Sequence, residues 1–320
     1  MTSYWLGAAL VTLSSFAVVA TVISLVIGLA APALTRRFER FSPASRATLL
    51  FRLRVLPAAG ATVWALGVAL PIFLWFEPRD NGDETFARTL FVMAAAGLAM
   101  LLRGAWRAVA GWRATGALTR EWQTRGRRLH DIAAPIPVFA IDESFPTVAV
   151  LGFSRPVLYI AERVLRECTA EEVRAMVLHE CAHVTHRDNF KRFLIRACPD
   201  LVRRGSTLDR AWTSAAEQAA DARAAAGNPG FALELAQALI RVARLAPHVS
   251  TVDVASAFYL GGSIEARVRR LVEPADSLPD PTRPFGCVRA CSLFVLAAGA
   301  VVVAAPAIHQ FMEAAVSALP

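Results

Sequence analysis

Residues 1–35 carry no charged side chain, and this uninterrupted apolar run restricts the possible folds more than any other feature of the chain. The hydrocarbon core of a bilayer is about 30 Å thick, and roughly 20 apolar residues in a helix cross it. A cleaved signal peptide is shorter than this run and has basic residues in front of it, whereas here the basic residues follow the run. We therefore expect a retained membrane-spanning helix at about residues 5–34.

Three further apolar runs predict additional spans, at about residues 55–76, 86–106 and 290–308. Hydrophobic residues make up 55% of the chain and the mean hydropathy is +0.44, which is high for a soluble protein. The third run reaches Trp106 only if the Arg103 side chain extends toward the headgroups, and its alternative is an interfacial or buried helix.

The four runs predict three parts of the chain. Residues 1–112 form a membrane region with three spans, residues 113–284 form a soluble domain, and residues 285–320 hold the fourth span and a short outer tail. The soluble domain is long enough for one hydrophobic core.

Arginine residues predict the orientation, because short cytoplasmic loops are enriched in Arg and Lys. The segment between the first two runs holds Arg36, Arg37, Arg40, Arg46, Arg52 and Arg54. This loop is therefore expected in the cytoplasm and the N-terminus outside. The third span then returns the chain to the inner side. We expect a multi-pass protein of the cell inner (plasma) membrane whose soluble domain is cytoplasmic.

The formal net charge of +8 comes almost entirely from arginine. A second group of arginines follows the third run, namely Arg113, Arg120, Arg125, Arg127 and Arg128. These side chains suit anionic lipid headgroups. No nucleic-acid recognition motif accompanies them, so we expect the lipid bilayer, and not a nucleic acid, as their partner.

Residues 179–183 read H-E-x-x-H. Thr169 and Glu172 form a T-x-x-E capping box, which predicts a helix that starts at Ala170 and contains the motif. His179 and His183 then share one face of that helix, as two ligands of a tetrahedral Zn²⁺ would. Glu180 is placed to take a proton from a metal-bound water, which makes it the candidate catalytic base.

An alanine-rich helix is predicted downstream and ends at Gly-Asn-Pro, residues 227–229. Glu217 and Asp221 lie four residues apart on it and therefore share a face. The small residues around them would let this helix approach the H-E-x-x-H helix closely. We assign Glu217 as the third Zn²⁺ ligand and Asp221 as the acceptor that orients a ligating histidine, most plausibly His179.

The first part of the soluble domain favours β-strands over residues 138–141, 148–151 and 157–160, with Pro146, Gly152 and Pro156 between them. The rest is expected to be helical. The fold class is therefore an α+β domain with a small sheet, attached to a multi-span helical membrane region. A strand at the edge of that sheet could pair with an extended peptide substrate.

The pattern H-E-x-x-H followed by E-x-x-x-D is similar to the zinc peptidases called gluzincins. Four stretches together resemble the BlaR/MecR family of membrane metallopeptidases, namely residues 151–160, residues 169–172, His179 to Asp188 with its Arg187-Asp188 pair, and residues 264–271. The resemblance implies a cytosolic gluzincin-like domain, three spans before it and one after. Family members that sense antibiotics carry a large outer domain after the last span, and we expect this chain to lack it.

The resemblance implies a membrane zinc metalloendopeptidase that cleaves a protein or peptide substrate, such as a cytosolic transcriptional repressor, in regulated signalling. Two alternatives remain open. One is a membrane quality-control protease of the HtpX type, and the other is a non-catalytic signalling or scaffold protein with a structural zinc site. The sequence does not indicate the oligomeric state.

Overall fold

The computed structural model describes residues 2–78, 87–199, 205–225, 229–245 and 264–273, together with residues 306, 307, 310 and 314. Most of the described chain is helical, with one small sheet. The predicted fourth span at 290–308 lies outside the described residues, except for residues 306 and 307.

Three helical stretches are long and apolar enough to cross a membrane. They are α1 (Thr2–Phe38), the continuous run of α2 (Pro43–Trp64), the π-helical turn η1 (Ala65–Ala69) and α3 (Leu70–Phe76), and α4 (Arg88–Arg125). This confirms the three predicted spans as apolar helices and associates the protein with a membrane. Each stretch exceeds the roughly 20 residues that a bilayer requires.

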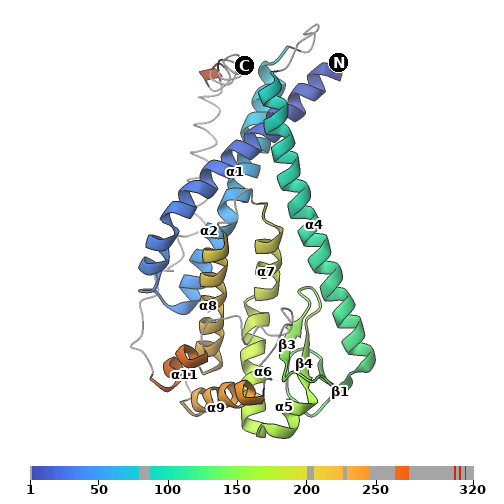
Figure 1. The fold of residues 1–320 in the computed structure, drawn as a ribbon, viewed down its shortest axis with the longest axis vertical. Coiled ribbons are helices and arrows are strands. Elements are labelled where there is room, and N and C mark those ends of the chain that lie inside the picture. Colours follow the sequence, from blue (N-terminus) through green and yellow to red (C-terminus); the bar gives the residue numbers. More distant parts are fainter. Residues whose placement is uncertain are drawn as a thin grey trace.

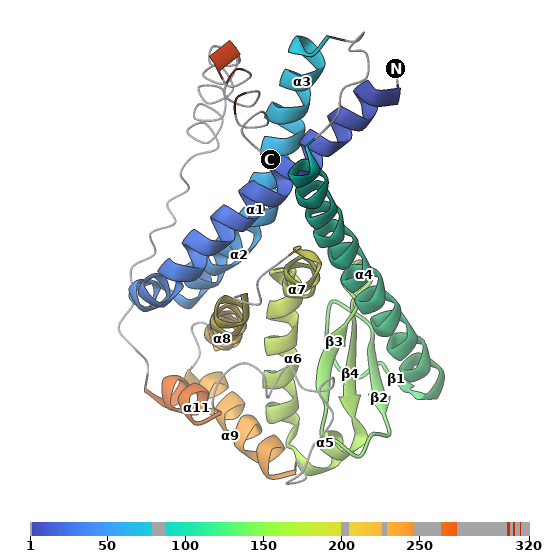
Figure 2. The same ribbon diagram turned by 45° about the horizontal axis from the view of Figure 1, so that its top comes forward.

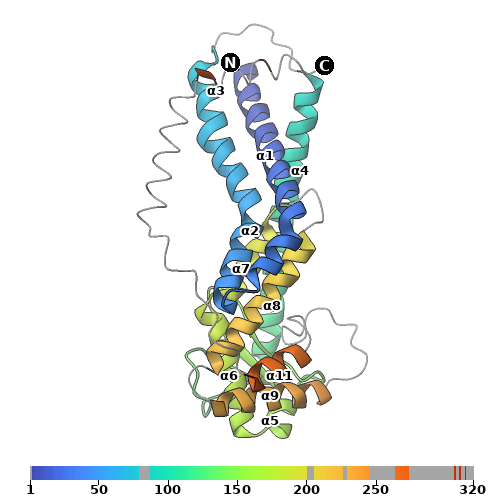
Figure 3. The same ribbon diagram turned by 90° about the vertical axis from the view of Figure 1, so that its left-hand side faces the viewer.

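The helix α4 converges on α1 near the N-terminus and diverges toward the other end from α1 and α2, which stay side by side there; the sheet and several of the other helices lie between α4 and this pair (Figures 1 and 2). Figure 3 shows the apolar helices at one end and, at the other, α5 (Glu162–Glu167), α9 (Pro229–Leu245) and α11 (Ile264–Val272). Exposed tryptophans occur toward both ends of the apolar segments: Trp5, Trp75, Trp106 and Trp112. Tryptophan is enriched at both boundaries of a bilayer, so this distribution agrees with a membrane around the converging ends.

Close packing between α1 and α4 depends on Gly97. A Cβ atom added at this position would overlap the backbone carbonyl oxygen of Leu13, and backbone cannot move aside as a flexible side chain can. We expect Gly97→Ala to lower the free energy of unfolding by about 1–3 kcal/mol, the usual cost of overpacking. A denaturant titration in detergent measures it. Gly111→Ala on the same helix is the control, since no described atom outside the backbone of that helix lies within 4 Å of its added Cβ.

The sheet contains β1 (Arg127–Leu129), β2 (Val138–Ile141), β3 (Val148–Leu151) and β4 (Val157–Ala161) in the order β1-β2-β4-β3. The β2–β4 pair is parallel, and the other two pairs are antiparallel. The three predicted strands are confirmed. The strand β1 was missed because its first two residues are exposed arginines, which give no apolar alternation.

The two faces of the sheet pack against different parts of the chain. On one face, the strands share a core with α6 (Ala170–Thr185) and α9 (Pro229–Leu245), which includes Leu158, Met176 and Leu239. On the other face, Trp122 of α4 contacts Tyr159 at a ring-centroid distance of 5.1 Å. The helix α4 therefore continues without a break from the apolar region into the packing of the sheet.

The other helices of the described residues are α5 (Glu162–Glu167), α7 (Asp188–Ala197), α8 (Gly205–Ala224) and α11 (Ile264–Val272). The capping box at the start of α6 is present, with Thr169 and Glu172 bonded reciprocally. The helix α8 lies between the lower parts of α1 and α2 on one side and α6 on the other (Figure 2).

Candidate metal centre

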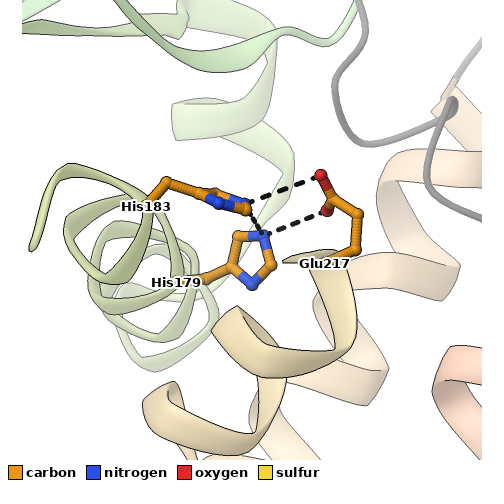
Figure 4. Close-up of side chains that lie close together, drawn as sticks. All are labelled: His179, His183 and Glu217. Carbon is orange, nitrogen blue, oxygen red and sulfur yellow. Dashed lines mark hydrogen bonds and ion pairs between the residues drawn. The ribbon is translucent and has the colours of Figure 1, made fainter. Parts of the chain in front are cut away.

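His179 and His183 project from one face of α6 and are buried. Their four-residue spacing places the two rings one above the other, and the Nε2 atoms lie 3.2 Å apart. A third side chain, Glu217 of α8, reaches the same point (Figure 4). Its Oε2 lies 3.4 Å from His179 Nε2, and its Oε1 lies 3.6 Å from His183 Nε2.

These separations fit a tetrahedral metal site. Zn²⁺ binds imidazole nitrogen and carboxylate oxygen at about 2.0–2.2 Å, so two ligand atoms at the tetrahedral angle are roughly 3.3 Å apart. The three measured separations, 3.2, 3.4 and 3.6 Å, are close to that value. The buried His-His-Glu group could therefore hold a metal ion.

Two further carboxylates fix the orientation of the imidazole rings. Asp221 Oδ1 lies 3.0 Å from His179 Nδ1, and Asp188 Oδ2 lies 2.8 Å from His183 Nδ1. A carboxylate accepts a hydrogen bond, so with a metal bound each Nδ1 would carry the ring proton of the neutral imidazole and each Nε2 would offer a lone pair. Both lone pairs then point toward Glu217, an arrangement that a cation would stabilise.

Asp221 thus lies where the sequence placed it, beside His179. Asp188 is a site residue that sequence reasoning missed. It was noted only as half of the Arg187-Asp188 pair, without a role. The reason for its position is local: Arg187 adopts a left-handed conformation with φ of 53°, which ends α6 and starts α7. A carboxylate five residues after a ligating histidine, at a helix break, is the signal that could have found it.

Arg267 of α11 is the second site residue that the sequence did not reveal. Its side chain is buried and donates to Asp221, with Nε–Oδ2 and NH2–Oδ1 distances of 2.8 and 2.6 Å. Its NH1 also lies 3.3 Å from Glu217 Oε2. This residue was predicted only as part of a helix that resembles one in the BlaR/MecR family. Arg267 and Asp221 are 46 residues apart in the sequence, so no local sequence pattern predicts their contact.

The electrostatic environment keeps Glu217 ionised. Burial alone would raise the pKa of its carboxyl group, but His183, His179 and Arg267 together hold that pKa well below its usual range. Both carboxylate oxygens are nevertheless buried and accept no hydrogen bond from the described residues. A buried carboxylate without such partners is costly, and a bound cation would remove this cost.

The charges around the site point to a divalent ion. Four carboxylates gather here, those of Glu180, Asp188, Glu217 and Asp221. Two cationic side chains accompany them, since Lys191 lies 3.1 Å from Asp188 and Arg267 contacts Asp221. Among the described residues, with these six groups ionised and both imidazoles neutral as a bound metal would require, two negative charges remain, which one divalent cation would balance.

Glu180 is buried at the sheet edge beside the two histidines. The Val150 backbone N–H donates to its Oε2 at 3.3 Å, and its Oε1 accepts no hydrogen bond from the described residues. Burial raises the pKa of the Glu180 carboxyl group in the protein alone, although His183 and His179 oppose this. A carboxylate with a raised pKa is a better proton acceptor at neutral pH than an exposed one.

The edge strand β3 lies against this site. Asn189 of α7 donates its Nδ2 to the carbonyl oxygens of Val150 and Gly152, at 2.9 and 3.0 Å. The outward N–H and C=O of Val150 are thus both held by side chains from α6 and α7. Two potential ligands near the motif are not part of the His-His-Glu group: His186 forms the C-cap of α6, and Cys181 is half-buried.

No protein-family model matches the chain, and no curated protein is significantly similar to it. The resemblance to the BlaR/MecR family therefore stays a prediction from short motifs. Functional conclusions depend on the geometry of the site.

Proposed function

We propose that this protein is an integral-membrane zinc metalloendopeptidase. The observation that carries the proposal is the convergence of two imidazole nitrogens and one ionised carboxylate on a single buried point, with a second buried carboxylate next to it in sequence. The three groups match the ligand set of catalytic zinc sites, and the fourth matches their proton acceptor.

The donor set favours zinc over the other common divalent ions. Mg²⁺ and Ca²⁺ prefer six or more oxygen ligands, whereas two imidazoles and one carboxylate suit Zn²⁺. His179, His183 and Glu217 would hold the ion. Among the described residues, this group offers three ligands and not the four of a structural zinc site, which leaves one position for water or substrate. When bound, zinc lowers the pKa of a water molecule and polarises a carbonyl group.

The protein's own residues perform the proton transfers. Glu180 accepts a proton from the attacking water and passes it to the leaving amine of the peptide bond. Asp221 and Asp188 hold the two imidazoles in the tautomer that directs Nε2 inward. A substrate would lie extended along β3, where its backbone would replace the contacts that Glu180 and Asn189 make with the N–H and C=O of Val150.

The proposed substrate is a protein that meets this domain on the cytosolic side of the membrane. The arginines between the first two spans and after the third favour a cytosolic site by the positive-inside rule. Cleavage of a cytosolic transcriptional repressor in regulated signalling is the activity that the BlaR/MecR resemblance supports.

A combined metal and cleavage assay on the purified full chain tests the proposal. We expect one zinc per chain by elemental analysis, and cleavage of a mixed peptide pool that 1,10-phenanthroline stops and added Zn²⁺ restores. Cleavage that persists in the chelator would refute the proposal. Zinc binding without cleavage of any peptide or co-purified protein would favour a structural site.

Metal binding should release protons at neutral pH. Burial lowers the pKa of His183, but Glu217 and Asp188 outweigh burial and raise it to about 10, so this ring is protonated at pH 7 in the protein without a metal. Zinc needs the deprotonated nitrogen, so affinity should rise with pH. Calorimetric titration with Zn²⁺ in buffers of different ionisation enthalpy counts the protons. An unchanged heat in all buffers would contradict this.

A further inference from the structure

The helix that provides Glu217 has a second face, which contacts the apolar helices. Opposite the metal site, α8 buries Leu208, Trp212, Ala215 and Ala216 in a core that includes Ile27 of α1 and Leu50 of α2. The segments on both sides of α8, residues 200–204 and 226–228, lie outside the described part of the chain. Among the described residues, packing between helices sets the position of α8.

One charged residue, Arg54, contacts both α8, which carries Glu217, and α7, which carries Asp188. Arg54 lies on α2, within the candidate span Pro43–Phe76, and its side chain is only 4% exposed. Its Nε donates to Asp209 Oδ1 of α8 at 2.7 Å, and its NH2 donates to the Ile195 carbonyl oxygen of α7 at 3.4 Å. It therefore ties α2 to the helix that carries Glu217 and to the helix that carries Asp188.

The burial of Arg54 makes this connection specific. A buried guanidinium is costly unless its partners are in place, so the side chain favours the one arrangement of α2, α7 and α8 that provides them. Arg192 of α7 adds a contact over the Trp212 ring of α8, at 5.9 Å from the centroid. The two helices are thereby held to each other as well as to α2.

We propose that Arg54 is a positioning residue for the metal centre: by anchoring α8 and α7 to α2, it holds Glu217 at ligand distance from the two histidines. This inference rests on the metal site of the proposed function, although not on peptidase activity. The histidines belong to α6, which packs on the sheet, whereas Glu217 belongs to a helix that packs on the membrane region. The two halves of the site are thus fixed to different parts of the molecule.

The coupling between the Arg54 contact and zinc binding acts in both directions. If the Arg54 contact improves zinc binding, then zinc must stabilise the arrangement of α2 and α8 by the same factor. A shift of α2 within the bilayer would change the affinity of the site, without any separate sensor contacting it.

The test is the zinc dissociation constant of the full chain in detergent, measured by chelator competition, for Arg54→Met, Asp209→Asn and the double variant. We expect each single variant to weaken zinc binding about tenfold, within the range for residues that orient metal ligands. The double variant should lose no more than either single one, because both remove the same contact. Arg54→Lys keeps the charge and should bind zinc more tightly than Arg54→Met.

Arg241→Met is the matched control. Arg241 also pairs with a carboxylate in this domain, at 2.9 Å from Glu172, but this pair lies at the start of α6 and does not reach α2. We expect this variant to have a lower melting temperature and an unchanged zinc affinity. Arg54→Met that binds zinc like the wild type, or Arg241→Met that loses as much affinity, would overturn the proposal. If the wild type itself binds no zinc, the proposed function fails as well.

Discussion

Glu180→Gln should lower the rate of peptide cleavage by about 10²–10⁴-fold and leave zinc bound. The amide keeps the size of the side chain and can still accept the Val150 N–H that Glu180 Oε2 accepts at 3.3 Å. It cannot take a proton from water, so only the acid–base step is removed. Glu180 is not among the three side chains that converge on the metal point, so the ligand set is unchanged. Cleavage rate and zinc content, measured on the same sample, check both parts.

Glu171→Gln provides the control for this prediction. It makes the same chemical change on the same helix, at an exposed position near the helix start. Its cleavage rate should match that of the wild type. Retained cleavage in Glu180→Gln would rule out Glu180 as the base, and loss of zinc in that variant would mean that Glu180 has a structural part in the site.

The local chemistry of the sequence predicted much of this structure. The strands β2, β3 and β4 follow from short apolar runs between proline and glycine, and the start of α6 follows from its capping box. The pairing of His179 with His183, and of Glu217 with Asp221, follows from the four-residue repeat of a helix face. These features depend only on residues that are near each other in the chain.

The missed residues depend on how distant elements pack. Arg267 contacts Asp221, which is 46 residues away in the sequence, and Arg54 contacts Asp209, which is 155 residues away. The periodic pattern of apolar residues in the sequence does not predict contacts between such distant positions. Each is a buried arginine, a residue type that is almost always exposed, so a sequence reading places it on the surface. The predicted span at about residues 86–106 covers only part of α4. The prediction was limited to the apolar residues that would cross a bilayer, whereas the helix continues to Arg125.

Arg267→Met should lower the free energy of unfolding by about 3–5 kcal/mol, the cost of leaving a buried charge without its partner. Methionine fills part of the space but leaves Asp221 without the two hydrogen bonds from Nε and NH2, and Glu217 without its nearest cation. Burial raises the pKa of Asp221, but Arg267 and His179 outweigh burial and lower it. Denaturant titration of the metal-free protein in detergent measures the loss.

The pH dependence of this loss separates a charge effect from a packing effect. A carboxyl group whose folded-state pKa is lowered adds stability above its usual pKa, near 3.8, and that contribution disappears as the pH falls through the folded value. Protonated Asp221 needs no cation, so the difference between Arg267→Met and the wild type should shrink in acid. Arg269→Met, on the exposed side of the same helix, should change stability by less than about 0.5 kcal/mol. A deficit of the same size at every pH would indicate a cavity and would argue against Arg267 as the counter-charge of this site.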